Sequence, residues 1–323
     1  MAAAGLSAGD LLAIVKPKKG KGEAPAFGDA PFDTELLTDA TAGDLTSPAL
    51  RGAQLLLMCG PPGCGKSSIK DELVRSMGIG PHITIDTDAV RTRLNAMGLT
   101  FPGLDTQKGL RTMTGVLNAY NARLSDHALR EGYSIVFDTT GRNRWAVKAL
   151  FKAARAHKPR RYATSMAIIY ASEDVCAERV AARNADPRSA GRLSLPAEMA
   201  RSIYRDFDGP QGAARFYILD GPATEGAMHD TLYLYDNNTQ SHPPRPELLY
   251  HGVDDVAIGP VVPFRGFYGI DIREEPPHLV PAEEPHAGGR RARRRTRSKR
   301  RTRKTRRRLR ATRRARRTRL TQN

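Results

Sequence analysis

An apolar run, a glycine-rich loop and an amphipathic segment follow one another between residues 54 and 77, and this order restricts the possible folds more than any other feature. The run 55–59 is short, apolar and bounded by glycine, which is typical of a buried parallel strand. Ile69, Leu73 and Met77 are spaced four residues apart, which predicts one buried helix face, and Gly78 is placed to end that helix. The loop between strand and helix is Gly60-Pro61-Pro62-Gly63-Cys64-Gly65-Lys66-Ser67-Ser68. In this context the pattern G-x-x-x-x-G-K-S is a Walker A motif, or P-loop.

The residue types of this loop suit a bound triphosphate. Glycines at 60, 63 and 65 permit backbone conformations that let successive N–H groups surround a phosphate at the positive end of the helix. Lys66 supplies a charge for the β- and γ-phosphates, and the hydroxyl of Ser67 suits Mg²⁺. We therefore predict that residues 60–68 bind ATP with Mg²⁺, and that Lys66 also acts in catalysis.

The net charge of +18 comes from one end of the chain. Residues 290–319 contain 20 Lys and Arg and no acid, so the remainder has 52 − 20 = 32 basic against 34 acidic residues, a net charge of −2. This Arg/Lys-rich tail has no aromatic residue that could stack on bases, so its binding would come from counterion release. We expect it to be disordered when free and to bind nucleic acid or another polyanion without sequence specificity.

Apolar segments alternate with helical patterns along the middle of the chain, which predicts an α/β fold with a mainly parallel five-stranded sheet flanked by helices. The predicted strands are 55–59, 82–88, 133–138, 162–171 and 231–236. Four regions follow from this pattern. Residues 1–49 are predicted to be mostly irregular, with a short helix near 8–15, and residues 50–238 to form the P-loop domain. Residues 239–289 are a proline-rich extension with room for a strand or two at the domain edge, and residues 290–323 are the tail.

Two carboxylates end the second predicted strand. Asp86 and Asp88 are two residues apart, so they share a face if the strand persists, and strand ends of this kind face the ligand in open α/β sheets. One interpretation is that Asp88 is the general base that takes a proton from an attacking hydroxyl, with Asp86 near the substrate. The other is that Asp88 caps the helix that begins at Ala89.

The third strand repeats this arrangement with Asp138 at its end, followed by Thr139, Thr140 and, after Gly141, Arg142. A carboxylate beside a P-loop strand has the position of a Walker B acid, which reaches Mg²⁺ directly or through water. The alternative is that Asp138 caps the turn with the two threonines. Trp145, the only tryptophan, is expected to pack at the start of the next helix.

Four arginines surround a polar loop between two later helices: Arg179 and Arg183 on one helix face, and Arg188 and Arg192 in the segment after it. Phosphoryl transfer needs cations that close over the γ-phosphate and stabilise charge as it moves. We expect one or two of the four to do this, and solvation to account for the others.

The chain is expected to work inside the cell, in the cytoplasm or the nucleus, and not to be secreted. Its three cysteines offer no disulfide framework, which is typical of a reducing compartment. No apolar run approaches the length of a membrane span, and the N-terminus lacks a signal-peptide pattern.

The motifs together resemble the zeta toxin family of P-loop kinases over about residues 50–250. The resemblance rests on Gly60 to Ser67, on Ile85-Asp86-Thr87-Asp88, on the run from Arg123 to Arg142 that contains Gly-Tyr-Ser-Ile-Val-Phe-Asp-Thr-Thr-Gly-Arg, and more loosely on Leu234-Tyr-Asp-Asn. Members of that family use ATP and Mg²⁺ to phosphorylate a sugar hydroxyl of UDP-N-acetylglucosamine.

The resemblance implies a role for several positions. Asp88 would be the base, and Asp138 and Arg142 would contact substrate or the transferring phosphate. Arg183 and one of Arg188 or Arg192 would form the charge-stabilising pair. The family usually has Glu where this chain has Asp138, and it fixes the sugar with a carboxylate in the preceding helix, where only Asp126 lies near. Both differences concern the sugar, and neither concerns the phosphates.

The sequence therefore predicts a kinase that transfers the γ-phosphate of ATP to a hydroxyl of a nucleotide-sugar. Two alternatives stay open. One is a polynucleotide or RNA-end kinase that the basic tail brings to its substrate. The other is a non-catalytic protein that binds nucleotide and nucleic acid.

Overall fold

In the computed structural model, an eight-stranded sheet forms the centre of the residues that the structure describes, which are 7–16, 24–45, 52–104, 106–157, 161–187, 195–209, 211–220, 229–238, 247–253, 256–257 and 267–268. The strand order is β1-β3-β4-β2-β5-β6-β7-β8. Five neighbouring strands are parallel: β3 (His82–Asp86), β4 (Ser134–Thr139), β2 (Gln54–Cys59), β5 (Ala163–Tyr170) and β6 (Thr231–Asp236). These are the five predicted strands, so the predicted α/β P-loop fold is confirmed.

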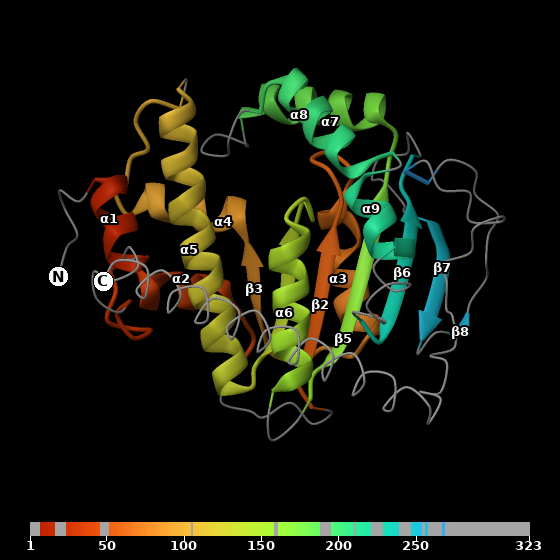
Figure 1. Ribbon diagram of the computed structural model, residues 1–323, viewed down its shortest axis with the longest axis horizontal. Coiled ribbons are helices and arrows are strands. Elements are labelled where there is room, and N and C mark those ends of the chain that lie inside the picture. Colours follow the sequence, from red (N-terminus) through yellow and green to blue (C-terminus); the bar gives the residue numbers. More distant parts are fainter. Residues whose placement is uncertain are drawn as a thin grey trace, which may run out of the picture. The chain divides into compact units, whose positions relative to one another are not determined.

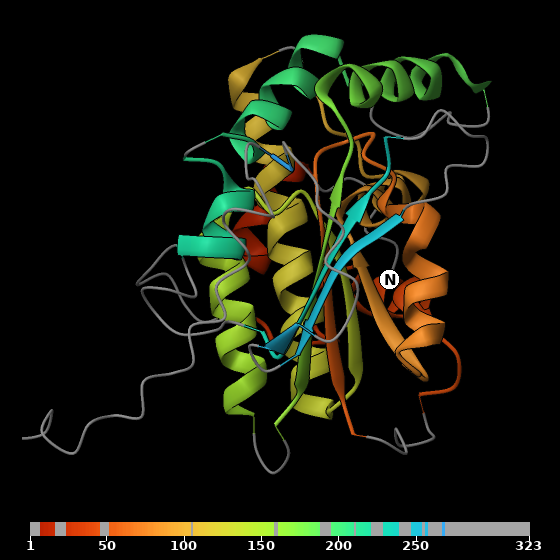
Figure 2. The same ribbon diagram turned by 90° about the vertical axis from the view of Figure 1, so that its right-hand side faces the viewer.

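Helices cover both faces of the sheet and one of its ends (Figures 1 and 2). The helices α5 (Gln107–Glu131) and α6 (Arg144–Ala156) lie on one face, and α3 (Lys66–Ser76) lies on the other. Two more helices, α7 (Glu173–Ala185) and α8 (Ala197–Phe207), lie beyond the carboxyl ends of the parallel strands. The helix α4 (Thr87–Ala96) starts at the same end, directly after β3. The P-loop and the strand-end carboxylates are therefore gathered at one edge.

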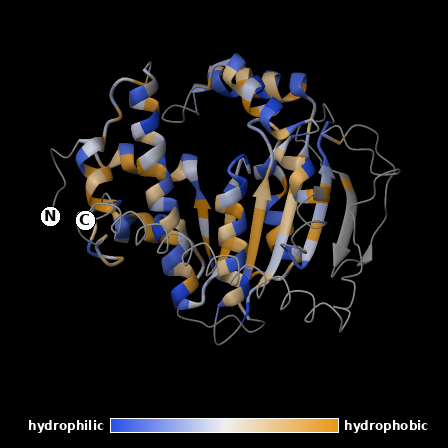
Figure 3. Cartoon of the chain, in the orientation of Figure 1, coloured by the Kyte–Doolittle hydropathy of each residue, from blue (hydrophilic) through white to orange (hydrophobic). Residues whose placement is uncertain are grey.

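The hydrophobic core lies between the central strands and the helices. Five of the six residues of β2 are buried, because the strand has a parallel neighbour on each side and helices over both faces. Figure 3 shows this concentration of hydrophobic residues in the central strands. The buried face of α3 is formed by Ile69 and Leu73, as their spacing predicts. Since the core fixes β2 and α3, it also fixes the loop that joins them.

The N-terminal segment corrects our expectation of a mostly irregular region. Within its described part, α1 (Ala8–Val15) confirms the predicted short helix, and α2 (Asp33–Ala40) and β1 (Thr41–Ala42) were not predicted. Leu11 and Leu36 are fully or almost fully buried. A Cβ at Gly115 on α5 would lie 3.0 Å from Leu12 Cδ2, so that glycine permits the close contact of α1 with α5. Short apolar stretches in a polar, glycine-rich segment gave too weak a periodicity to reveal this packing.

Three further strands with antiparallel pairing extend the sheet beyond the five predicted ones. β1 pairs with β3 at one edge, and β7 (Glu247–Val253) and β8 (Val256–Ala257) follow β6 at the other. The extension also includes Phe267 and Tyr268, both buried, and the Tyr268 hydroxyl donates a hydrogen bond to the Ile169 carbonyl at 2.6 Å. A strand or two at this edge was expected. The described helices include none with the length and hydropathy that a membrane crossing needs.

The compact unit that contains these elements spans residues 1–279, and residues 280–323 form a second unit. The predicted basic tail lies in that second unit and outside the described residues.

Candidate functional site

The P-loop glycines adopt conformations that a side chain would obstruct. Gly60, Gly63 and Gly65 all have positive φ, of 154°, 83° and 92°. A Cβ at Gly63 would lie 2.3 Å from the Cys176 carbonyl oxygen, and one at Gly65 would lie 2.0 Å from Asn237 Nδ2. The P-loop is thus held between α7 and the residue that follows β6. Glycine occupies the two positions where the Cβ of any other residue would clash with these neighbours.

Lys66 begins α3 and points across the loop that precedes it. Its ammonium group donates a hydrogen bond to the Gly60 carbonyl at 2.9 Å and lies 3.7 Å from the Asp138 carboxylate. Only 13% of the Lys66 side chain and 16% of the Asp138 side chain are exposed. A partly buried ion pair of this kind places a cation at the helix N-terminus, where a phosphate would also meet backbone N–H groups.

Asp86 and Asp88 have different local roles. The strand β3 ends at Asp86, and Asp86 is the N-cap of α4: its Oδ1 accepts hydrogen bonds from the N–H groups of Asp88 at 2.8 Å and Ala89 at 3.5 Å. Asp88 lies in the first turn of α4 and is exposed. The expectation that both carboxylates share a strand face is wrong, because the strand stops before Asp88. The capping role proposed for Asp88 belongs to Asp86, and the Asp88 side chain faces the cavity described below.

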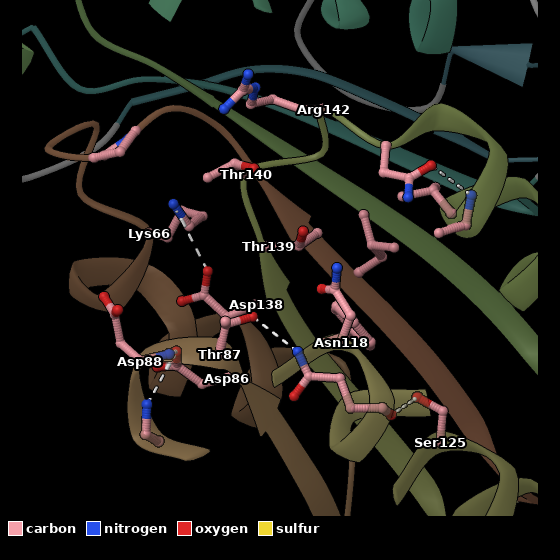
Figure 4. A pocket seen from close by; sticks show the side chains of 18 of the residues that line it. Lys66, Asp86, Thr87, Asp88, Asn118, Ser125, Asp138, Thr139, Thr140 and Arg142 are labelled. Carbon is pink, nitrogen blue, oxygen red and sulfur yellow. Dashed lines mark hydrogen bonds and ion pairs between the residues drawn. The ribbon is translucent and has the colours of Figure 1, made fainter. Parts of the chain in front are cut away.

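Asp138 lies on β4, directly beside Asp86 of β3 in the parallel register. Burial raises the pKa of its carboxyl to about 6, Lys66 opposes this shift, and Asp86 adds to it. Figure 4 shows Lys66, Asp88 and Asp138 turned toward a shared space. Asp86 and Asp138 thus place two carboxylates on neighbouring strands, and no three acidic, histidine or cysteine side chains of the described residues lie close enough to hold a metal ion by themselves, so an ion here would need phosphate oxygens as further ligands.

A cavity of about 1530 Å³ joins these groups. Its P-loop side is lined by Pro62, Gly63, Gly65, Lys66, Ser67 and Ser68, whereas Gly60, Pro61 and Cys64 face the protein interior. The strand ends contribute Asp86 and Asp138, the first turn of α4 contributes Asp88, and the loop after β4 contributes Arg142. Pockets for one small ligand are usually about 300 to 1,000 Å³. The cavity is therefore large enough for two ligands side by side.

The arginines of the later helices divide into different roles. Arg179 donates hydrogen bonds to the Asn237 carbonyl at 2.9 Å and to the Gly63 carbonyl at 3.4 Å, so it links the P-loop to the residue that follows β6. Arg183 lines the cavity, and its Nε is buried with no hydrogen-bond partner among the described residues. Such a donor suits an anionic ligand. Arg188 and Arg192 lie in the stretch 188–194, outside the described residues.

Arg142 forms an ion pair with Asp206 of α8, although both side chains are about half exposed. This contact links the loop after β4 to a helix that lies beyond the strand ends. Arg142 lines the cavity from this position. Nearby Trp145 is 77% exposed, so the expectation that it packs in the protein is wrong; the Lys148 ammonium lies 5.5 Å from the centre of its ring.

Sequence reasoning gave no role to three asparagines, although Asn237 stands in the run 234–237 that carries part of the family resemblance. Asn237 is fully buried and donates a hydrogen bond from Nδ2 to the Cys64 carbonyl at 2.8 Å. Asn121 on α5 donates to Thr87 Oγ1 at 2.8 Å, and Asn118 lines the cavity one turn earlier (Figure 4). Amides on a long mixed helix give no periodic signal. Of the three, Asn237 alone directly follows a predicted strand, 231–236. A search for polar residues at strand ends could therefore have found it.

Similar solved structures include kinases and a toxin–antitoxin system. A structure of AvrRxo1-ORF1 and ORF2 with ATP is 13% identical and covers 62% of this chain and 59% of its own, with a TM-score of 0.43. A structure of the PezAT chromosomal toxin–antitoxin system of Streptococcus pneumoniae is 13% identical and covers 69% and 81%, with a TM-score of 0.44. Shikimate kinase from Acinetobacter baumannii with shikimate is 16% identical and covers 58% and 85%, with a TM-score of 0.31. This chain thus spans 59% of the AvrRxo1 chain that it matches.

No curated protein matches the chain. Its sequence does match a family model: residues 55–203 match AAA_33, described as an AAA domain. That range contains the Walker A loop, the carboxylates of Asp86, Asp88 and Asp138, and Arg183. The family match and the clasped glycine loop agree that this part of the chain is a P-loop nucleotide-binding domain.

Proposed function

We propose that the protein is an ATP-dependent kinase that transfers the γ-phosphate to an alcohol, and that a nucleotide-sugar such as UDP-N-acetylglucosamine is the acceptor. The observation that supports it best is the position of Asp88. Its carboxylate opens into the same cavity as Lys66, next to the loop that would hold the phosphates. A base within reach of both phosphate and acceptor is what in-line transfer requires.

The residues of the site suit each step of this reaction. Backbone N–H groups of the loop and Lys66 would hold the β- and γ-phosphates, and Asp88 would accept the proton of the acceptor hydroxyl. Arg183 would stabilise the charge of the transferring phosphoryl group, with Arg192 as its proposed partner from the loop. Arg142 would reach the substrate after leaving Asp206. Asp86 would act on the substrate through α4, whose start it fixes.

The donor set also fits Mg²⁺, which prefers oxygen ligands and keeps several waters. Ser67 and Asp138 both line the cavity, and the pKa of the Asp138 carboxyl is raised chiefly by burial, with Lys66 opposing the shift. These two residues would hold the ion together with phosphate oxygens. When bound, Mg²⁺ would neutralise charge on the β- and γ-phosphates.

Turnover of ATP in the presence of UDP-N-acetylglucosamine tests the proposal, with the wild type compared with Asp88→Asn and Lys66→Ala. We expect a phosphorylated nucleotide-sugar from the wild type and a loss of at least about 100-fold for Asp88→Asn, as for other removed general bases. Lys152→Ala, on the exposed side of α6, is the control for Lys66→Ala. Equal product formation by the wild type and Asp88→Asn would remove Asp88 from the proposed role.

The basic tail supports a second candidate, a polynucleotide or RNA-end kinase. Twenty positive charges within thirty residues would raise the local concentration of a nucleic acid. The two candidates are distinguished by removing residues 290–323. A nucleotide-sugar kinase keeps its activity on the small acceptor, whereas an end kinase loses labelling of oligonucleotide termini. The tail would in either case bind nucleic acid or another polyanion.

A further inference from the structure

The cavity does not end at the catalytic groups but continues along α4 to the N-terminal segment. Along α4 its wall is formed by Asp88, Thr92, Arg93 and Ala96. At 1.5 Å per residue, Arg93 lies about 8 Å and Ala96 about 12 Å along the helix axis from Asp88. Lys16 at the end of α1 and Asp39 of α2 line the same cavity. Two segments that precede the P-loop domain therefore close one side of it.

This remote end contains a pair of cations and one acid. Arg93 Nε lies 3.1 Å from Asp39 Oδ2, and both side chains are close to 40% exposed. Lys16 is exposed and forms no ion pair within the described part of the chain. The three groups together have a net charge of +1. This basic cluster lies a helix turn or more from Asp88, apart from the cations Lys66, Arg142 and Arg183 that line the P-loop end of the cavity.

The N-terminal wall is held in place by buried contacts, so its charges are preorganised. The Asp33 side chain is fully buried and accepts a hydrogen bond from Arg123 Nε of α5 at 2.9 Å. Arg123 also donates to the carbonyls of Pro25 and Ala26, both at 2.9 Å. The Tyr120 hydroxyl donates to the Pro31 carbonyl. These contacts fix α2, and with it Asp39, against the helix that forms the opposite wall.

We propose that Lys16 and Arg93 form a subsite for the anionic part of the acceptor, a diphosphate or similar group, at the end of the cavity remote from the P-loop. Asp39 holds Arg93 in place and partly neutralises it when no ligand is bound. The orientation of the acceptor, with its hydroxyl toward Asp88, rests on the proposed kinase function. A free hexose has no anionic group to bind Lys16 and Arg93, whereas a nucleotide-sugar has one, so this subsite would select for the diphosphate.

Binding of UDP tests the subsite without any turnover. The full-length protein is first saturated with Mg²⁺ and a non-hydrolysable ATP analogue, so that the P-loop is filled, and UDP is then titrated by calorimetry. We expect Lys16→Ala and Arg93→Ala each to weaken UDP binding about fivefold to tenfold, the effect of losing one charged hydrogen bond. Lys152→Ala and Arg111→Ala, exposed residues that do not line the cavity, are the matched controls.

The direction in which Asp39→Asn changes the affinity for UDP decides between a binding role and a structural role. If Arg93 binds an anion, removal of the competing carboxylate strengthens UDP binding about threefold, and 0.5 M NaCl reduces the difference. If Asp39 and Arg93 serve structure alone, Asp39→Asn leaves UDP binding unchanged or weakens it. Failure of UDP to bind the analogue-filled protein, or equal affinities in all variants, would also overturn the subsite. Absence of phosphoryl transfer to UDP-N-acetylglucosamine with UDP binding intact would overturn only the kinase proposal.

Discussion

The Lys66 ammonium group lies between the Gly60 carbonyl, 2.9 Å away, and the Asp138 carboxylate, 3.7 Å away. Burial alone would lower the pKa of Lys66, but neighbouring groups that include Asp138 and Asp86 raise it. Lys66 therefore stays charged at neutral pH. Its two contacts hold it on the loop, one residue before the serine proposed to bind Mg²⁺.

The first prediction concerns that charge. Lys66→Ala is expected to lower kcat/KM for ATP by about 100-fold or more, because the variant loses the cation that would contact the β- and γ-phosphates. It also leaves Asp138 without its ion-pair partner. Steady-state ATP turnover measures the effect, with Lys152→Ala expected to match the wild type. Wild-type kinetics in Lys66→Ala would show that the loop holds triphosphate in some other way.

The second prediction follows from the raised pKa of Asp138, about 6 against a reference of 3.8. The folded protein binds the Asp138 proton more tightly than the unfolded chain does, so this group stabilises the fold at low pH. That contribution is lost as pH rises from about 4 through 6. Asp138→Asn is therefore expected to gain stability relative to the ligand-free wild type as the pH rises from 4.5 to 7.5, while the cost of leaving Lys66 without its partner is present at both pH values. Urea unfolding at the two pH values measures it; an equal difference at both would contradict the assignment.

The sequence predicted the five parallel strands, the helices between them and the cluster of carboxylates, because the apolar strand runs and the Walker A spacing are local patterns. It could not divide the roles of Asp86 and Asp88, since that depends on where β3 stops. It also missed the N-terminal wall. The contacts of Arg123 with Asp33 and with the chain near Pro25 join positions about ninety residues apart, and no local periodicity records such contacts.

The third prediction separates the two carboxylates at the start of α4. Asp86→Ala removes the N-cap and is expected to lower the free energy of unfolding by about 1 kcal/mol. Within the described residues, Asp88 forms hydrogen bonds through its backbone, so Asp88→Asn is expected to leave stability within about 0.5 kcal/mol of the wild type while it abolishes turnover. Chemical denaturation and turnover are measured on both variants. The reverse outcome, with Asp88→Asn destabilised and active, would assign the structural role to Asp88.

The fourth prediction concerns the clasp around Gly65. A Cβ there would lie 2.0 Å from Asn237 Nδ2, and Asn237 cannot move aside easily because it is fully buried and donates to the Cys64 carbonyl. The φ of 92° adds strain for any residue with a side chain. Gly65→Ala is therefore expected to weaken binding of a fluorescent ATP analogue by at least about tenfold. Gly80→Ala is the matched control, because a Cβ at Gly80 meets no atom within 4 Å and its φ is not positive. If both variants bind the analogue as the wild type does, the contact between Asn237 and the loop does not shape the phosphate site.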